Sequence, residues 1–288
     1  MNKSDSIVVT GAYGFIGSRL VHFLNERGHK NIIVSDYLTN GQSFKSLNGA
    51  SYISYIHPDD LKDMLSNTIP ERTHVFHMGA VSDTTCWDGD LVMKRNVRFS
   101  HELITYCVME EIPITYASSA SVYGNGDGPQ NLYAYSKFLV DKIVDVMVKH
   151  VNLKSTLQGF RFFNVYGAGD EEQYKGDQAS PYYKFRNQAL ETGRIEIFEG
   201  SEKIFRDFVS VDRVCDIMYR MAYTDKSGIF DLGTGTCKSF LQVAIEVAQW
   251  CKDVHGVDVD IVTVPFPEKL KGAYQYYTKA DMSYLQEI

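Results

Sequence analysis

Near the N-terminus, the β-branched run 7–9 leads into a loop with glycines at positions 11, 14 and 17. Such a run predicts a buried parallel strand, and Gly11 can adopt the backbone angles that a tight turn requires. Gly14 leaves room for a pyrophosphate, and Gly17 allows the next helix to pack closely on the strand. The N–H groups and positive dipole at the start of that helix attract phosphate charge. The pattern therefore predicts a dinucleotide-binding site.

The sequence after the loop agrees with this prediction. Ile16, Leu20 and Phe23 lie on one helical stripe, and residues 31–36 predict a second strand that ends at Asp36. An acidic residue about 20 residues beyond the glycines accepts hydrogen bonds from the ribose hydroxyls of adenosine. A glycine-rich turn without a ligand is the alternative, and the complete strand–helix–strand pattern argues against it.

Composition and charge exclude several classes of protein. The chain has 288 residues, enough for one large domain or two small ones. Its net charge, 29 basic minus 36 acidic side chains, is −7, which argues against nucleic acids and anionic membranes as partners. Neither a membrane-spanning run nor a signal sequence is recognisable, so we expect a cytoplasmic protein. The five cysteines are scattered without a CxxC spacing, which predicts reduced thiols and no metal site.

Strand and helix patterns alternate along much of the chain. Further strands are predicted at 74–80, 114–119 and 157–163, and helices at about 59–65, 91–109 and 133–148. This alternation predicts an α/β fold, a Rossmann-type doubly wound parallel sheet. His74 and His77, on one of these strands, are expected to be structural.

Beyond residue 165 the composition changes, which predicts a smaller α/β substrate domain. We expect residues 1–165 and 203–229 to form the NAD(P)-binding domain, and residues 166–202 and 230–288 to form the substrate domain.

A tyrosine and a lysine, Tyr133 and Lys137, stand four residues apart and share one face of a predicted helix. Tyrosine is a poor base, with a pKa near 10, and a neighbouring ammonium group favours the phenolate. Ser119 ends the preceding predicted strand. Downstream of a dinucleotide loop, these residues predict a site that removes a carbinol proton while hydride leaves the same carbon. A surface tyrosine above a lysine is the structural alternative.

The glycine loop 11–17, the motif Ser119-x-x-x-Tyr123-Gly124 and the pair Tyr133-x-x-x-Lys137 resemble the extended short-chain dehydrogenase/reductase family of nucleotide-sugar enzymes. Other segments resemble the ADP-heptose 6-epimerases within that family, namely 77–80, 84–89, 160–167, 198–201, 206–209 and 265–272. The resemblance runs nearly end to end. It implies an epimerase of a nucleotide-activated sugar, with ADP-heptose as substrate, which oxidises the sugar transiently to a ketone with tightly bound NADP or, alternatively, NAD. It also implies a homo-oligomer.

The resemblance assigns catalytic roles position by position. Tyr133 and Lys175 would be acid/base groups on opposite sides of the substrate. Lys137 would contact the nicotinamide ribose, and Ser119 would hold the reacting hydroxyl. A solvated loop lysine is the alternative interpretation of Lys175.

The implied binding residues form two sets. Those for the cofactor are Gly11, Tyr13, Gly14, Phe15, Ile16, Gly17, Asp36, Tyr37, Met78, Gly79, Ala80, Ser82, Asn96, Lys137 and Val165. Those for the substrate are Ser82, Asn164, Lys175, Asp177, Lys184, Phe198, Glu199, Gly200, Ser201, Arg206 and Tyr274. The planar guanidinium of an arginine suits the oxygens of a diphosphate.

The chain departs from the family pattern at several positions. Ser43 replaces a lysine that serves the 2′-phosphate of NADP, although Lys45 lies two residues on. Asp177 replaces a serine, Lys184 replaces a histidine, and the segment 124–131 is short. The usual last helix is also expected to be missing. These departures weaken the assignment of heptose more than that of the reaction.

Other functions remain open. A 4-epimerase or a net dehydrogenase would use the same residues. Dehydration is disfavoured because Ala120 and Ser121 follow Ser119 where dehydratases of this type carry Asp-Glu. A non-catalytic module that senses the cofactor is the alternative from another class, and the intact proton-transfer residues argue against it.

Overall fold

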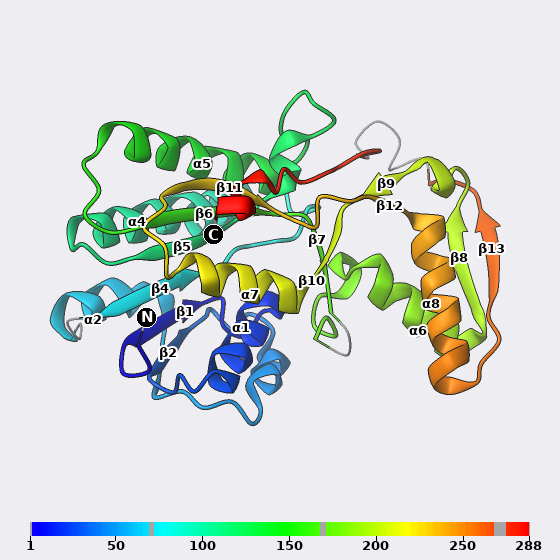
Figure 1. Ribbon diagram of the computed structural model, residues 1–288, viewed down its shortest axis with the longest axis horizontal. Helices are drawn as coiled ribbons and strands as arrows, with labels where there is room; N and C mark the ends of the chain where they lie inside the picture. Colours follow the sequence, from blue (N-terminus) through cyan, green and yellow to red (C-terminus); the bar gives the residue numbers. More distant parts are fainter. Residues whose placement is uncertain (1, 69–71, 168–170, 268–274, 288) are drawn as a thin grey trace.

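The computed structural model describes all residues except 1, 69–71, 168–170, 268–274 and 288 (Figure 1). Its main feature is a sheet of seven parallel strands in the order β11-β6-β5-β4-β1-β2-β3. The strands are β1 (Ser6–Thr10), β2 (Ile32–Ser35), β3 (Ser54–Ile56), β4 (Thr73–His77), β5 (Ile114–Ser119), β6 (Leu157–Phe162) and β11 (Gly228–Leu232). The predicted α/β, Rossmann-type fold is confirmed.

Helices cover both faces of this sheet. They are α1 (Phe15–Glu26), α2 (Leu61–Thr68), α3 (Gly89–Val92), α4 (Phe99–Met109), α5 (Leu132–His150) and α7 (Val211–Met221). Short 3-10 helices are η1 (Gly41–Leu47), η2 (Pro58–Asp60) and η4 (Ala120–Tyr123), and η3 (Met93–Arg98) is a π-helical turn. In Figure 1, α4 and α5 lie on one side of the sheet and α1 and α7 on the other.

Alternating side chains of the strands explain the two layers. Ile7 and Val9 face a cluster that includes α1 and α7, whereas Val8 between them faces a second cluster that includes α2, α4 and α5. Strand β1 is therefore apolar on both faces. This explains why the first strand reads as a continuous run of β-branched residues.

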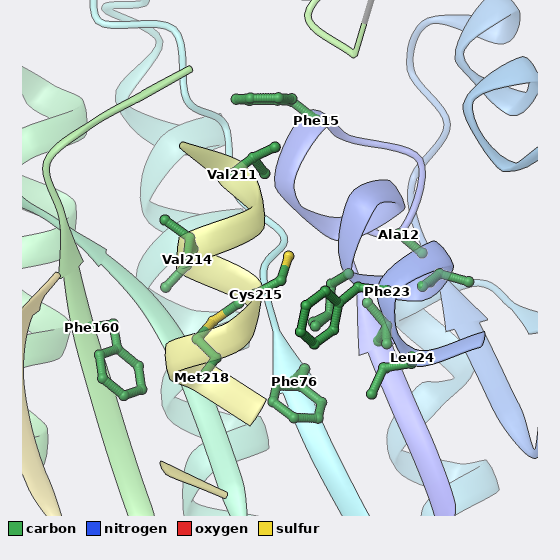
Figure 2. Close-up of a cluster of buried hydrophobic side chains, with 14 of the residues drawn as sticks. Ala12, Phe15, Phe23, Leu24, Phe76, Phe160, Val211, Val214, Cys215 and Met218 are labelled. Carbon is green, nitrogen blue, oxygen red and sulfur yellow. The ribbon is translucent and has the colours of Figure 1, made fainter. Parts of the chain in front are cut away.

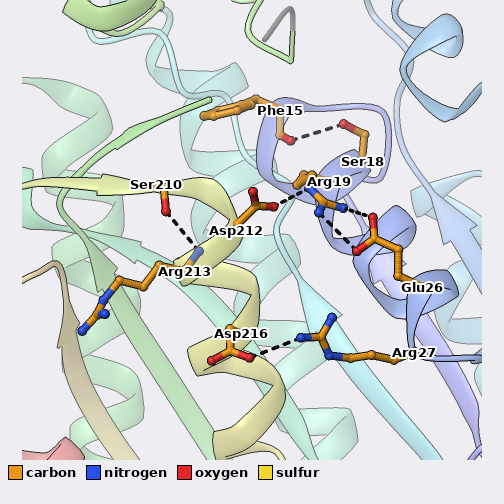
Figure 3. Close-up of polar contacts among 9 residues, drawn as sticks. All are labelled: Phe15, Ser18, Arg19, Glu26, Arg27, Ser210, Asp212, Arg213 and Asp216. Carbon is orange, nitrogen blue, oxygen red and sulfur yellow. Dashed lines mark hydrogen bonds and ion pairs between the residues drawn. The ribbon is translucent and has the colours of Figure 1, made fainter. Parts of the chain in front are cut away.

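The α1–α7 layer holds the glycine loop in place. Phe23 and Leu24 of α1 pack with Val214, Cys215 and neighbouring residues of α7 over the sheet (Figure 2). At the rim, the Arg19 guanidinium lies 2.6 Å from a carboxylate oxygen of Asp212 and 2.9 Å from one of Glu26, and a weaker pair joins Arg27 to Asp216 (Figure 3). These partly exposed pairs add little stability, so the apolar contact with α7 is what fixes α1 on the sheet.

A smaller lobe lies beside the sheet, on the right in Figure 1. Among the described residues, the lobe is built of two longer helices, two short 3-10 turns and three two-stranded sheets, in which β10 pairs with β7, β12 with β9 and β13 with β8. Its elements are β7 (Asn164–Tyr166), η5 (Gly176–Gln178), α6 (Pro181–Thr192), β8 (Arg194–Phe198), η6 (Ser201–Lys203), β9 (Phe205–Arg206), β10 (Phe208–Ser210), β12 (Lys238–Ser239), α8 (Phe240–His255) and β13 (Asp260–Val264). The chain returns towards the main sheet and forms η8 (Ser283–Glu287).

Several details differ from the sequence-based expectations. Strands β9 and β10, expected in the NAD(P)-binding domain, lie in the smaller lobe, and η8, expected in the substrate domain, packs against the core of the main sheet. The expected boundary between residues 229 and 230 falls inside β11, which pairs with β6 in the main sheet. The helix expected over 91–109 is interrupted by the π-helical turn η3. Within the described residues, no helix is long and apolar enough to cross a membrane. All five cysteines are free, and no group of residues suited to a metal ion occurs in the part of the chain that the structure describes.

Candidate active site

The glycine loop connects β1 to α1 at the carboxyl edge of the sheet. Gly11 has a φ of +64°, and a Cβ there would lie 2.5 Å from the Gly79 backbone. A Cβ at Gly17 would lie 2.1 Å from the Gly11 carbonyl oxygen. Both positions therefore require glycine.

The start of α1 fits a phosphate group. Gly14 is the N-cap of α1 and has no side chain to cap it, whereas side chains cap α3, α5, α6, α7 and α8 among the helices described. The first N–H groups of a helix lack partners within it. The α1 N-terminus thus presents them, with the positive end of the helix dipole, beside the glycine loop. This is the arrangement that a dinucleotide pyrophosphate requires.

Asp36 follows β2 at the same edge. One of its carboxylate oxygens accepts a hydrogen bond from the Tyr13 N–H and the other accepts one from the Leu38 N–H, each at 3.0 Å. These bonds fix the carboxylate against the glycine loop. Each oxygen keeps a further lone pair for a ribose hydroxyl.

Tyr37, the next residue, donates its hydroxyl hydrogen bond to Asp59 at 2.9 Å. The guanidinium carbon of Arg95 lies 4.1 Å from the centroid of the Tyr37 ring. A cation therefore lies against the side chain of the residue that follows Asp36.

The end of β4 lies against the glycine loop. The Gly79 N–H donates to the Thr10 hydroxyl at 3.2 Å, and that hydroxyl lies 2.6 Å from Nδ1 of His77. Nε2 of His77 lies 2.8 Å from the Ser100 hydroxyl. Burial lowers the pKa of His77 to about 3, so the ring is neutral, and burial has the same effect on His74. Both histidines are structural.

Asn96 lies in the π-helical turn and is fully buried. Its amide nitrogen donates to the Val81 carbonyl and to the Ser136 hydroxyl, and its amide oxygen accepts from the Val81 N–H. Asn96 thereby joins the loop after β4 to α5. Its contacts here are with protein groups.

Ser119, Tyr133 and Lys137 come together where β5 ends beside α5. Tyr133 and Ser119 share a side-chain hydrogen bond, and Ser119 also accepts from the N–H and hydroxyl of Ser121. Lys137 is 3% exposed and donates to the Ala117 carbonyl at 2.7 Å. The three functional groups that the sequence predicted therefore gather at one place.

Burial dominates the titration of this cluster. It lowers the pKa of Lys137 to about 8, partly offset by the negative charge of Asp141. Burial raises the pKa of Tyr133, and the hydrogen bond with Ser119 opposes this. In this structure the pKa of Tyr133 lies above its ordinary value, because desolvation of the phenolate outweighs the hydrogen bond with Ser119.

Lys175 lies on the loop that follows β7. Its ammonium nitrogen is 5.0 Å from the centroid of the Phe15 ring, at the start of α1. Burial lowers the pKa of Lys175, Glu172 opposes this, and Lys184 adds to it. The side chain thus turns towards the cofactor loop, which argues against a freely solvated lysine.

The other expected substrate residues lie in or beside the elements of the smaller lobe. Asn164 donates to the Asp207 carbonyl at 3.0 Å, and Arg206 and Ser201 are buried. Asp177 and Lys184 are exposed, and the Lys184 ammonium donates to the Asp177 carbonyl. Phe198 ends β8 and the turn Glu199-Gly200 follows it, whereas Tyr274 lies outside the described residues.

The remaining cofactor residues lie along the carboxyl edge of the sheet. Met78 and Ala80 flank Gly79, and the exposed Ser82 follows on the same loop. Ile16 of α1 packs against the core, and Val165 is the middle residue of β7.

Two buried carboxylates that sequence analysis missed organise the loops. Glu172, fully buried, accepts hydrogen bonds from the Gly167 N–H and from the N–H and hydroxyl of Ser180. It thereby shapes the loop that carries Lys175. Asp207, also fully buried, accepts from the N–H groups of Thr234, Gly235 and Ala280. An isolated acidic residue in a sequence gives no signal of such a role.

Comparison with known proteins identifies the family of the chain. The model of the NAD dependent epimerase/dehydratase family matches residues 7–233. The ADP-L-glycero-D-manno-heptose-6-epimerase of Thiobacillus denitrificans is 39% identical over 312 residues, covering 98% of this chain and 92% of that protein. The crystal structure of the Helicobacter pylori ADP-L-glycero-D-manno-heptose-6-epimerase is similar with a TM-score of 0.78 at 29% identity, covering 92% of this chain and 85% of that one.

A more distant structure shares the fold. The UDP-glucose 4-epimerase of Thermotoga maritima has a TM-score of 0.80 at 23% identity, covering 98% of this chain and 91% of that one. From the extent of the family match and the identity to a curated relative, the chain belongs to the NAD dependent epimerase/dehydratase family.

Proposed function

We propose that this protein epimerises carbon 6 of the heptose in an ADP-heptose by transient oxidation to a ketone. The observation that carries the proposal is the cluster of Ser119, Tyr133 and the buried Lys137 where β5 ends beside α5, with Lys175 reaching the glycine loop from the smaller lobe. The 39% identity to an enzyme named for this reaction supports the choice of sugar and nucleotide.

The residues divide the proton chemistry among them. Tyr133 takes the proton of the carbinol hydroxyl, which Ser119 orients by a hydrogen bond. Lys137 contacts the nicotinamide ribose and favours the phenolate of Tyr133 once the site is filled. When bound, oxidised nicotinamide would accept the hydride of the carbinol carbon and later return it to the ketone. The chain's own contribution is to orient the carbinol, exclude water and move its proton.

Inversion requires hydride to return to the opposite face of the ketone. The sugar must therefore turn and present its oxygen to a second proton donor. Lys175 lies partly desolvated on a different element from Tyr133, and a lysine with a lowered pKa can exchange a proton near neutral pH. A simple dehydrogenase has no use for this second group.

A screen of ADP-, UDP-, GDP- and CDP-activated sugars, with NMR detection of products, tests the proposal. We expect ADP-heptose to be epimerised fastest. Inversion at carbon 4 of a UDP-hexose, or net accumulation of a ketone, would establish the 4-epimerase or the dehydrogenase instead.

We infer that NADP is bound modestly more tightly than NAD. The Arg95 guanidinium lies over the ring of Tyr37, the residue after Asp36, and can pair with a 2′-phosphate. An arginine serves this purpose in related dinucleotide sites. Asp36 opposes this preference. Ser43 is buried and donates to the Asn40 carbonyl, so it supplies no charge.

Isothermal titration calorimetry with both cofactors checks this prediction. In Arg95→Leu, we expect the affinity for NADP to fall about tenfold, the scale of one charge-assisted hydrogen bond, and the affinity for NAD to change less than about threefold. Lys45→Leu is the matched comparison, since Lys45 is exposed on η1. Loss of NADP affinity in that variant instead would assign the phosphate to Lys45, and a strong NAD preference of the unaltered protein would refute the inference.

A further inference from the structure

A third side chain continues the line of Tyr133 and Lys137 along α5. Asp141 is one helical turn beyond Lys137, and it is 3% exposed. One carboxylate oxygen accepts from the Tyr116 hydroxyl of β5 at 2.9 Å, and the other accepts from Nε of Arg161 of β6 at 2.8 Å. Asp141 therefore ties the helix that carries the proton-transfer groups to the two strands beneath it.

The hydrogen bonds continue away from the helix. Arg161 donates from Nη1 to the Tyr123 hydroxyl at 2.7 Å, and Tyr123 donates to Asp231 of β11 at 2.6 Å. The other oxygen of Asp231 accepts from the Asp281 N–H at 3.1 Å. The network thus reaches from α5 across the sheet to the C-terminal segment.

The Lys137 ammonium donates to the Ala117 carbonyl, and the negative charge that favours its protonated form is Asp141, one turn along the same helix. His77 of β4 faces it and is neutral, Tyr116 of β5 binds Asp141, and the positive Arg161 of β6 lies beyond that carboxylate. Tyr123 of η4 and Asp231 of β11 are joined to Arg161.

The charged and titratable side chains of the helices next to α5 do not face Lys137. The exposed residues are Asp90 of α3, Lys94 and Arg98 of η3, and His101 and Glu102 of α4; Arg95 lies over Tyr37. A buried ammonium is costly unless a negative charge compensates it.

We propose that Asp141 is a positioning residue that keeps the buried Lys137 ammonium charged and aligned for the cofactor ribose. The proposal rests on the proposed function only in assigning Lys137 to the ribose. Arg161 pairs directly with the Asp141 carboxylate and thereby limits the negative charge that Lys137 experiences.

Cofactor binding tests the proposal without requiring turnover. The affinity of the full chain for NADP is measured by calorimetry from pH 6 to 10. If the charged form of Lys137 binds ribose, the affinity falls as pH rises through the pKa of Lys137. Asp141→Asn removes a negative charge that stabilises the ammonium, so we expect the midpoint of this fall to move about one pH unit lower. Arg161→Met removes a competing cation, so its midpoint is expected to move higher.

The controls separate charge from folding. Asp145→Asn makes the same substitution one turn further along α5, where Asp145 pairs with Lys149 on the surface, and its midpoint should not move. Asp141→Glu should restore much of the original midpoint. If Asp141→Asn does not fold, the upward shift of the midpoint in Arg161→Met still tests the proposal.

An unchanged midpoint in a folded Asp141→Asn or in Arg161→Met, or an equal loss of affinity at every pH, would overturn the proposal. If the midpoints of NADP affinity move as expected in both variants but the unaltered protein converts no sugar, the proposed function alone is refuted.

Discussion

Tyr133→Phe is expected to retain its fold and its cofactor and to lose at least about a hundredfold in the rate of epimerisation, the usual scale for a general acid/base. The substitution removes only the hydroxyl that exchanges a proton with the carbinol and contacts Ser119. The rate is measured by NMR with saturating sugar, and the cofactor content is measured by absorbance after denaturation.

Tyr135→Phe is the matched control for that variant. Tyr135 lies on the same helix two residues on, its side chain is 46% exposed, and the same hydroxyl is removed. The control should turn over at the rate of the unaltered protein. Near-normal turnover of Tyr133→Phe would show that another group accepts the proton.

Lys175→Met should reduce epimerisation by about a hundredfold from either epimer, because inversion needs a proton donor for both orientations of the ketone. Methionine keeps an unbranched side chain against Phe15 while removing the ammonium group. Half-reactions that depend on Tyr133, such as reduction of an aldehyde analogue by bound reduced cofactor, should partly survive. The half-reaction is followed by loss of the absorbance of the reduced cofactor in a single turnover.

Lys252→Met controls for loss of a positive charge, since Lys252 pairs with Asp258 at the end of α8. This variant should epimerise normally. If Lys175→Met does so as well, the two-base mechanism is wrong and Lys175 is a loop residue without a catalytic role.

The elements around the cofactor could be predicted because local chemistry specifies them. Gly11 and Gly17 are required by close backbone contacts, and the buried strand β1 reads as a β-branched run because both its faces pack against helices. The positions of Ser119, Tyr133 and Lys137 followed from the end of a strand and the period of a helix. These features depend on a few neighbouring residues.

Features that depend on distant partners could not be predicted. The π-helical turn at Asn96 is stabilised by hydrogen bonds to Val81 and Ser136, far apart in the sequence. The sequence therefore predicted one uninterrupted helix over 91–109. The smaller lobe forms where helices α6 and α8 pack on strands β8 and β13. No local sequence motif predicted these elements.

The same limit applies to electrostatics. The spacing of Tyr133 and Lys137 indicated that they are close, but the balance between burial and hydrogen bonding that raises the pKa of Tyr133 arises from the packed site. Glu172 and Asp141 likewise acquire their roles from the loops and strands that surround them.

Epimerisation of ADP-heptose in D₂O tests the central proposal most directly. The purified protein is incubated with each epimer at carbon 6 of the heptose, and carbon 6 is observed by NMR. The account predicts that both epimers reach the same mixture, without net change in cofactor oxidation state and with the original hydrogen retained on carbon 6, because hydride leaves and returns within the site. Deuterium on carbon 6 would contradict it by showing proton abstraction from carbon, and absence of conversion from both epimers would contradict the assigned substrate.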